Sequence, residues 1–216
     1  MVFIFAETHK IIARSLHENL RDKHDIELNE DRLLWGSIVP DISPKYKLQR
    51  HYIQDSLHFI SNEIVTLIFV SRFMNLRDHK NSLTMKLFSR KIGIISHYLS
   101  DFCCMAHAKN WSFNGSFVKH VQYEKAVNEA ASMHEFTPVR LQTEEIDLHS
   151  EPILRLRKLI AEQIASIIEE YKAQEESIAC DLNFALALNT QIASFVIELI
   201  LAMQQGAMPV QTTLVY

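Results

Sequence analysis

One stretch of the chain, residues 96–124, gathers side chains that could bind a metal ion. It reads SHYLSDFCCMAHAKNWSFNGSFVKHVQYE and holds His97, Asp101, His107, His120 and Glu124. The pairs His97/Asp101 and His120/Glu124 are both spaced i,i+4, which on a helix places the two side chains on one face with Cβ atoms about 5–6 Å apart. Imidazole nitrogens and carboxylate oxygens both bind zinc, at about 2.0–2.2 Å. The spacing therefore favours a metal site built from helices.

Each pair taken alone has a simpler explanation, because a His and an acidic residue one turn apart often form a surface pair or a helix cap. The residues around the first pair argue against that explanation. The segment 87–99, LFSRKIGIISHYL, is largely apolar, so we expect His97 and Asp101 to point into the core. A buried carboxylate is costly unless it is paired or bound to a metal. Two such pairs with another His between them indicate a metal site.

Three motifs in this stretch, SHYLSD, MAHA and HVQYE, resemble the second half of the zinc-dependent phospholipase C family. The S1/P1 nucleases are relatives of that family, and the domain at the amino end of glycosylphosphatidylinositol-specific phospholipase D is also similar. The intervals fit too, since His107 follows Asp101 by six positions and Glu124 follows His120 by four. The resemblance implies an all-α fold, in which a single multi-helix domain over residues 1–216 carries a metal cluster in its core.

The resemblance also implies ligands in the first half of the chain. The family begins with a Thr-His-x-x-Ile-like segment whose His binds metal, which matches His9, and a Gly-x-x-x-Pro-Asp segment matches Asp41. The family then uses a His that is followed by an aromatic residue. Both His51 and His58 fit, and His51 is assigned because it lies nearer to the Asp. The metal-binding part would cover residues 8–128.

By the same resemblance, the eight side chains divide among zinc ions. One zinc is implied at Asp41, His51, His97 and Asp101, and a second at His107, His120 and Glu124. A third, shared by His9 and Asp101, stays open, because relatives with three metals also use an amino-terminal Trp and no Trp precedes His9 here. Asp41 is the implied catalytic residue, which orients or deprotonates the attacking water.

Composition describes an ordinary globular chain. With 216 residues, 48% of them hydrophobic, the chain is long enough to bury a core. The net charge of −4 offers no basic surface for a nucleic-acid backbone, so we expect no stable nucleic-acid binding. Three cysteines, two of them adjacent, make no disulfide framework. The first ten residues, MVFIFAETHK, do not resemble a secretory signal, so we expect a cytoplasmic location.

Few glycines and prolines interrupt the chain, which predicts long helices. We expect a first helix over residues 10–21 that Thr8 caps, and a loop over residues 35–44 that contains two prolines and a glycine. His58 would open or line a core helix that runs to about residue 72. The central helix is expected over residues 83–104.

The remaining chain predicts three more helices, over residues 117–131, 152–176 and 182–204, so that C-terminal helices fill residues 151–205. Pro152 fits the first turn of the second of these. The last helix is strongly apolar, but its polar residues Asn189 and Gln191 and the charged Glu198 favour core packing or a homodimer face over a membrane span.

Together these features predict a metal-dependent phosphodiester hydrolase, most simply a phospholipase C that cleaves a phospholipid head group with metal-activated water. An S1/P1-type nuclease is the nearest enzymatic alternative. Its closing motif tends to be His-x-x-x-Asp, so Glu124 and the acidic net charge favour the lipase. The alternative from another class is a metal-stabilised helical protein without catalytic activity, which the missing Trp before His9 and the missing secretory signal both support.

Overall fold

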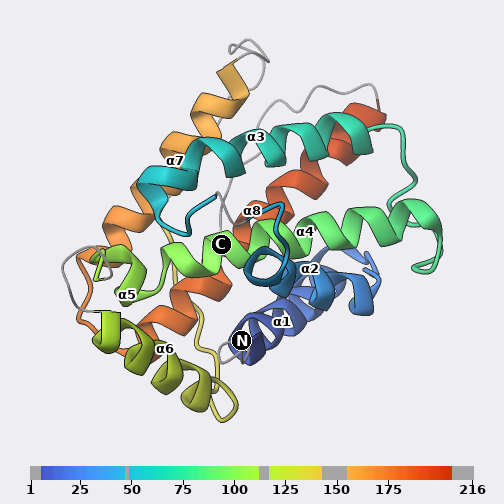
Figure 1. Cartoon of the computed structure of the whole chain (residues 1–216). Coiled ribbons are helices and arrows are strands. Elements are labelled where there is room, and N and C mark those ends of the chain that lie inside the picture. Colours follow the sequence, from blue (N-terminus) through green and yellow to red (C-terminus); the bar gives the residue numbers. More distant parts are fainter. Residues whose placement is uncertain (1–5, 47–48, 112–116, 143–154, 206–216) are drawn as a thin grey trace.

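The computed structural model describes residues 6–46, 49–111, 117–142 and 155–205, and within these ranges the chain is helical with no β-strand (Figure 1). Eight α-helices follow one another in this described part: α1 (Ala6–His24), α2 (Glu30–Ile42), α3 (Ile53–Ser71), α4 (Leu83–Phe102), α5 (Met105–Ala108), α6 (Phe117–Ala131), α7 (Leu156–Lys172) and α8 (Ile178–Gln204). The predicted all-α fold is confirmed.

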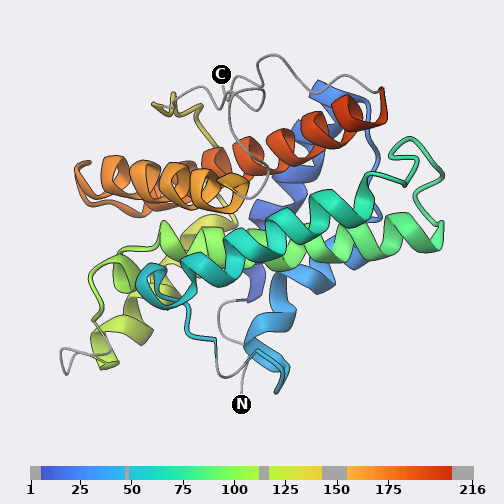
Figure 2. The same ribbon diagram turned by 90° about the horizontal axis from the view of Figure 1, so that it is seen from above.

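The other helices pack around α4. It contacts α2, α3 and α8, while α1 lies against α2 and α8, and α7 lies on α3 (Figures 1 and 2). Ser82 begins the helix, because its side chain accepts a hydrogen bond from the backbone N–H of Met85 and so satisfies one donor of the first turn. Every residue from Ile92 to Phe102 is buried. The second half of α4 therefore meets neighbouring helices on all sides.

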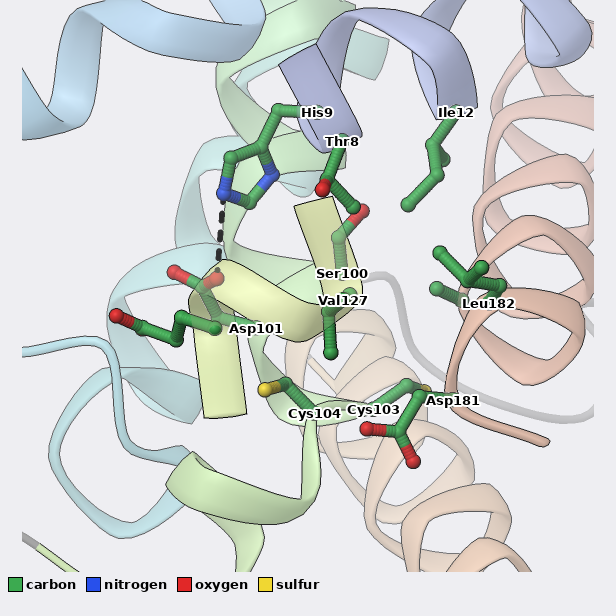
Figure 3. Close-up of a pocket in the computed structure, with 12 residues that line it drawn as sticks. Thr8, His9, Ile12, Ser100, Asp101, Cys103, Cys104, Val127, Asp181 and Leu182 are labelled. Carbon is green, nitrogen blue, oxygen red and sulfur yellow. Dashed lines mark ion pairs between the residues drawn. The ribbon is translucent and has the colours of Figure 1, made fainter. Parts of the chain in front are cut away.

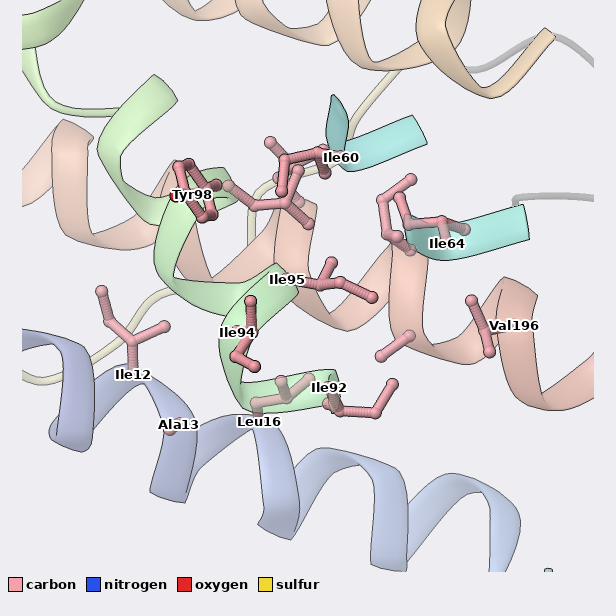
Figure 4. Packing of buried hydrophobic residues seen from close by; sticks show 14 of the residues in the cluster. Ile12, Ala13, Leu16, Ile60, Ile64, Ile92, Ile94, Ile95, Tyr98 and Val196 are labelled. Atoms are coloured by element: carbon pink, nitrogen blue, oxygen red, sulfur yellow. The ribbon is translucent and has the colours of Figure 1, made fainter. Parts of the chain in front are cut away.

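Aliphatic side chains from four helices meet beside α4 (Figure 4). All of the following are 3% exposed or less: Ile12 and Leu16 of α1, Ile60 and Ile64 of α3, Ile92 and Ile95 of α4, and Val196 of α8. Burying one such side chain fully contributes about 1.5–3 kcal/mol. The same cluster continues through buried residues of α2, α5, α6 and α7, so one core joins all the described helices.

Two glycines let α2 and α4 approach more closely than side chains would allow. Gly36 of α2 faces Gly93 of α4, and a Cβ added to Gly93 would lie 2.8 Å from the backbone nitrogen of Ser37. A Cβ added to Gly36 would lie 3.0 Å from the Cα of Gly93. Backbone atoms in a close-packed interior cannot move aside as the end of a flexible side chain can. The two helices can therefore cross here only with hydrogen at both positions.

The predicted loop over residues 35–44 is wrong, because residues 35–42 form the second half of α2. The helix runs on to Ile42 with Pro40 inside its last turn, and the backbone N–H of Ser43 then donates to the Val39 carbonyl at 2.9 Å. Glycine and proline are both typical of turns, which is why the sequence predicts a loop here. In the structure Gly36 serves the helix crossing, and Pro40 removes one helical hydrogen bond close to the end of the helix. Asp41 therefore projects from a helix end.

The predicted cap of the first helix is also wrong. The described part of α1 begins at Ala6, so Thr8 and His9 lie inside the helix. The backbone N–H of Thr8 donates to Oδ1 of Asn128 at 3.1 Å, and its hydroxyl lies 3.3 Å from the same atom. Thr8 thus connects α1 to α6 across the fold. The helix needs no cap at Thr8 because it starts earlier.

The C-terminal helices form where the sequence predicts them, with different ends. Residues 151–154, which include Pro152, lie outside the described residues, and α7 begins at Leu156. By length and composition α8 is apolar enough to cross a membrane, but 78% of its most apolar window is buried inside the protein. Most of this window therefore packs against other parts of the protein. A homodimer through the C-terminal helices stays a prediction.

Replacing Gly93 with Ala is expected to lower the free energy of unfolding by about 2–3 kcal/mol, because the added methyl group overpacks the crossing of α2 and α4. Thermal unfolding followed by circular dichroism should show a lower Tm. Leu87→Ala is the control, since this side chain of the same helix is 55% exposed, and it should change the free energy by less than about 0.5 kcal/mol. An unchanged Tm for Gly93→Ala would contradict the close crossing.

Candidate metal centre

The structure brings all eight side chains named from the sequence to one place in the fold. They come from five helices and one connecting segment: His9 (α1), Asp41 (α2), His51 (before α3), His97 and Asp101 (α4), His107 (α5), and His120 and Glu124 (α6). Seven of these side chains are 21% exposed or less, and Asp41, at 37%, is the most exposed. Asp41 therefore lies where the cluster meets solvent.

Asp101, in the last turn of α4, is the centre of the cluster. Its Oδ2 lies 2.8 Å from Nδ1 of His51 and 3.3 Å from Nε2 of His97. Its Oδ1 lies 3.4 Å from Nε2 of His9 and 3.8 Å from Nε2 of His107. Figure 3 shows the imidazole of His9 and the carboxylate of Asp101 facing each other. One carboxylate thus faces imidazoles from three helices and from the segment before α3.

Asp41, His51, His97 and Asp101 form the first group of donors. Nε2 of His97 lies 3.4 Å from Oδ1 of Asp41 and 3.3 Å from Nδ1 of His51, and the last two atoms are 3.6 Å apart. A tetrahedral zinc ion with bonds of about 2.0–2.2 Å keeps its ligand atoms about 3.3–3.6 Å apart. His51 and Asp101 lie at the shorter distance of a hydrogen bond. The distances of His97 from Asp41, His51 and Asp101, and of His51 from Asp41, have the spacing that zinc requires.

The backbone of α2 orients His97 in this group. Nδ1 of His97 donates to the carbonyl oxygen of Ser37 at 2.8 Å, and the imidazole is fully buried. A carbonyl oxygen can only accept, so the hydrogen sits on Nδ1 and the lone pair on Nε2. That lone pair points at the carboxylates. This contact lies next to the crossing of Gly36 and Gly93, so the close approach of α2 and α4 sets the orientation of the imidazole.

His107, His120 and Glu124 form the second group. Oε1 of Glu124 lies 2.9 Å from Nε2 of His107 and 2.8 Å from Nε2 of His120. The two imidazoles meet edge to face, with ring centroids 4.7 Å apart. His120 and Glu124 lie one turn apart on α6, as their spacing predicts. Within each of the sets His9/Asp41/His97, His51/His97/Asp101 and His107/His120/Glu124, the donor atoms lie within 4.8 Å of one another.

Burial keeps two of the histidines neutral. It lowers the pKa of His97 to about 4, and it lowers the pKa of His9 to about 4 with a further contribution from His97. Their ordinary pKa is about 6.5. Both imidazoles therefore keep a free lone pair at neutral pH, which is the form that binds a metal.

The two most buried carboxylates of the cluster stay ionised. Burial opposes this, but the surrounding imidazoles, His97 first among them, hold the pKa of Asp101 well below its usual range. Hydrogen bonds with His107 and His120 likewise overcome burial and lower the pKa of Glu124 to about 2. Two ionised carboxylates thus lie in a mostly buried place, which favours a bound cation.

Burial and neighbouring charges also shift the pKa values of His51, His107 and Asp41. Burial lowers the pKa of His51 and of His107, but Asp101 together with Glu124 outweighs it and raises both above their ordinary value. Burial raises the pKa of Asp41. Protons therefore compete for the imidazoles of His51 and His107 in the metal-free protein.

The residues of the cluster fit zinc. Imidazoles and carboxylates are the nitrogen and oxygen ligands that zinc takes in proteins. Nδ1 of His9 and Nδ1 of His107 are buried without a hydrogen-bond partner among the described residues, although buried polar atoms are nearly always paired. Hydrogen bonds among the described residues therefore do not satisfy both ring nitrogens of these two histidines. The assignment of the eight side chains as zinc ligands stays a prediction.

Two features beside the cluster escaped the sequence analysis. One is the Ser37 carbonyl, whose contact with His97 has no sequence signal. The other is Asp181 of α8, which is 2% exposed and lines a cavity of about 40 Å³ together with Cys104, Glu124 and other residues (Figure 3). The cavity also reaches His9 and Asp101. An acidic residue in the first turn of an apolar helix was the available signal, and by itself it indicates a helix N-terminus.

The all-α fold and the buried group of imidazoles and carboxylates define a helical protein whose core could hold divalent cations. A family model described as zinc-dependent phospholipase C matches residues 8–181. The chain belongs to the zinc-dependent phospholipase C family, and the resemblance found in the sequence is confirmed. Neither the search of curated proteins nor the search of solved structures found a match. The matched range contains all eight side chains of the cluster and extends through α7 to Asp181.

His51→Ala is expected to lower the zinc content of the purified protein by about one ion per chain, because it removes a donor from the first group. His58→Ala is the matched control. His58 is also followed by an aromatic residue, but it lies exposed on α3. Elemental analysis of both variants measures the difference. Equal zinc contents would show that His51 is not a ligand.

Zinc affinity is expected to fall as the pH is lowered from about 8 to about 6. Only neutral imidazole binds zinc, and the pKa values of His51 and His107 in the metal-free protein are raised, so protons displace zinc already in this window. Titration of metal-free protein with zinc against a chromogenic chelator at several pH values measures the effect. An affinity that stays constant across the window would exclude these two imidazoles as ligands.

Proposed function

We propose that this protein is a zinc-dependent hydrolase of phosphodiesters that cleaves phospholipid head groups in the manner of a phospholipase C. The observation that carries the proposal is the cluster of five histidines and three carboxylates centred on Asp101 in a member of this family. A phosphodiester is an anion that repels nucleophiles, so its hydrolysis requires positive charge at the reacting phosphate. A buried cluster of ligands for divalent cations meets that requirement.

The proposal assigns the side chains as the family resemblance implies. Asp41, His51, His97 and Asp101 hold one zinc, and His107, His120 and Glu124 hold a second. His9 faces Oδ1 of Asp101 and belongs to a third position, so the number of ions is left to metal analysis. Zinc bound at such sites neutralises the phosphate charge and lowers the pKa of water to about 7.

Asp41 is the side chain that we assign to catalysis. It is the most exposed member of the cluster, so it borders the space from which water and substrate arrive. Its Oδ1 also lies 3.4 Å from Nε2 of His97, which keeps it beside the first group of donors. Burial raises its pKa and so makes its carboxylate a stronger base. Its role is to orient the attacking water and to accept the proton of that water.

A phospholipid is the substrate class that the family supports. The net charge of −4 disfavours a long polyanion such as nucleic acid. A cytoplasmic location is part of the proposal, since Cys103, Cys104 and Cys180 are free thiols, which suits a reducing compartment.

Asp41→Asn is expected to lower kcat by roughly 100-fold or more, because the amide cannot accept the proton of the attacking water. The zinc-loaded protein would be assayed on a chromogenic phosphocholine diester, on phospholipid vesicles and on single-stranded DNA, with zinc content measured in parallel. Asp31→Asn is the matched control. Asp31 lies exposed in the first turn of the same helix, and its replacement should leave kcat unchanged.

The other outcomes decide between the remaining hypotheses. Cleavage of single-stranded DNA in preference to the phosphocholine diester would assign a nuclease of the S1/P1 type. Zinc at two or more ions per chain without hydrolysis of any substrate would assign a metal-stabilised protein without turnover. Equal rates for wild type and Asp41→Asn would remove Asp41 from the mechanism.

A further inference from the structure

A second buried carboxylate lies outside the cluster, in the first turn of α8. Asp181 is 2% exposed. Its Oδ1 accepts a hydrogen bond from the hydroxyl of Tyr171 at 2.6 Å, and its Oδ2 accepts from the hydroxyl of Tyr123 at 2.9 Å and from the backbone N–H of Met105 at 3.0 Å. The three donors belong to α7, α6 and α5. A single carboxylate of α8 therefore binds three other helices.

Asp181 is costly to bury. Burial raises its pKa to about 6, although all three hydrogen bonds favour the ionised form. Its place in the first turn of α8 also favours negative charge, through the helix dipole. The carboxylate is thus ionised at neutral pH, and its hydrogen bonds are of the stronger, charge-assisted kind. Removing a group of this kind from a buried network leaves its donors without a partner.

The bond to Met105 fixes α5. This helix has four residues, which is too few for a helix to be stable by itself, and its N-cap residue Cys104 supplies no side-chain hydrogen bond. Asp181 supplies the missing acceptor from a different helix. His107 is the third residue of α5, and no group in the described part of the chain forms a hydrogen bond with its Nδ1. The position of this imidazole in the second group therefore depends on the backbone that Asp181 holds.

The bond to Tyr123 fixes α6 in a similar way. The buried residues of α6 are His120, Val127 and Ala131, so apolar packing holds this helix weakly. Tyr123 packs edge to face on Trp111, with ring centroids 5.2 Å apart, and its hydroxyl reaches Asp181. Glu124 is the next residue along the chain. The same carboxylate thus holds the two segments that bear all three donors of the second group.

We propose that Asp181 is a positioning residue for the second group, His107, His120 and Glu124. The proposal rests on the zinc-binding role proposed above. Asp181 acts through α5 and α6 and is not itself a ligand. The hydrogen bonds of its carboxylate within the described residues do not reach α2, α4 or the segment before α3, which carry the first group. Its loss should therefore weaken one group and spare the other.

The test measures zinc affinity without any substrate. Metal-free protein is titrated with zinc against a chromogenic chelator, and His120→Ala identifies the ion that the second group holds. Asp181→Asn should weaken binding of that ion by about 10–100-fold, as the loss of a supporting partner of a metal ligand does. Tyr123→Phe should weaken it in the same direction, and zinc at the first group should keep its affinity.

Tyr171→Phe is the matched control. It removes the shortest of the three hydrogen bonds, and this bond joins α8 to α7, not to α5 or α6. It should lower the Tm as Asp181→Asn does, but should change zinc affinity by less than about threefold. A role of Asp181 in general stability alone predicts that zinc affinity follows Tm across all variants, and that result would overturn the proposal. If Asp181→Asn does not fold, Tyr123→Phe against Tyr171→Phe gives the same comparison.

Failure of this proposal can be told apart from failure of the proposed function. A wild-type protein that binds no zinc removable by His120→Ala would overturn the proposal and the assignment of the second group together. Zinc binding that Asp181→Asn weakens, in a protein that hydrolyses no phosphodiester, would support Asp181 as a positioning residue and overturn the hydrolase. Unchanged zinc affinity in both Asp181→Asn and Tyr123→Phe would overturn the positioning role alone.

Discussion

The close crossing of α2 and α4 at Gly36 and Gly93 is the contact on which the cluster depends most directly. Because neither residue has a Cβ, the backbone of α2 comes near enough for the Ser37 carbonyl to bind Nδ1 of His97. That bond fixes both the tautomer and the direction of a fully buried imidazole, whose Nε2 then faces Asp41, His51 and Asp101. The crossing also places the end of α2, with Asp41, beside the last turns of α4. The lack of a Cβ at Gly36 and Gly93 thus allows the donors of the first group to meet.

Without a metal ion, the buried ionised carboxylates of the cluster cost free energy of folding. Asp101 and Glu124 are ionised, while burial keeps His9 and His97 neutral, so only protons taken up by His51 and His107 can compensate the two carboxylates. Ionised groups in a largely buried site cost free energy that hydrogen bonds alone repay poorly. Divalent cations would remove this cost and use the unprotonated nitrogens. A fold that assembles such a cluster from five helices therefore links its own stability to metal binding.

Local periodicity could predict six of the eight described helices, though not α2 or α5, and the i,i+4 pairs, because both depend on neighbours in sequence. The helix over residues 117–131 has the predicted ends, and His97 and Asp101 point inward as the apolar segment before them indicates. The segment 35–44 was wrongly predicted as a loop, because a glycine in the sequence is equally compatible with a turn and with a close helix crossing, and Gly36 serves the crossing. The pairing of residue 181 with residue 105 is invisible to any local pattern. Asp41 and His51 were found by resemblance, since no spacing rule relates them to α4.

The two groups of donors are supported in different ways, and this difference has a physical consequence. The first group stands on the central helix α4 and on α2, whose crossing is rigid because it is made of backbone against backbone. The second group stands on α5, of four residues, and on α6, whose contribution to the core is small. Beside a few buried apolar side chains, polar bonds hold these two segments in place: those of the Asp181 carboxylate, and those of Thr8 to Asn128. Polar bonds open more easily when water enters than apolar packing does. A metal ion bound by His107, His120 and Glu124 would therefore be coupled more strongly to local ordering than one bound by the first group.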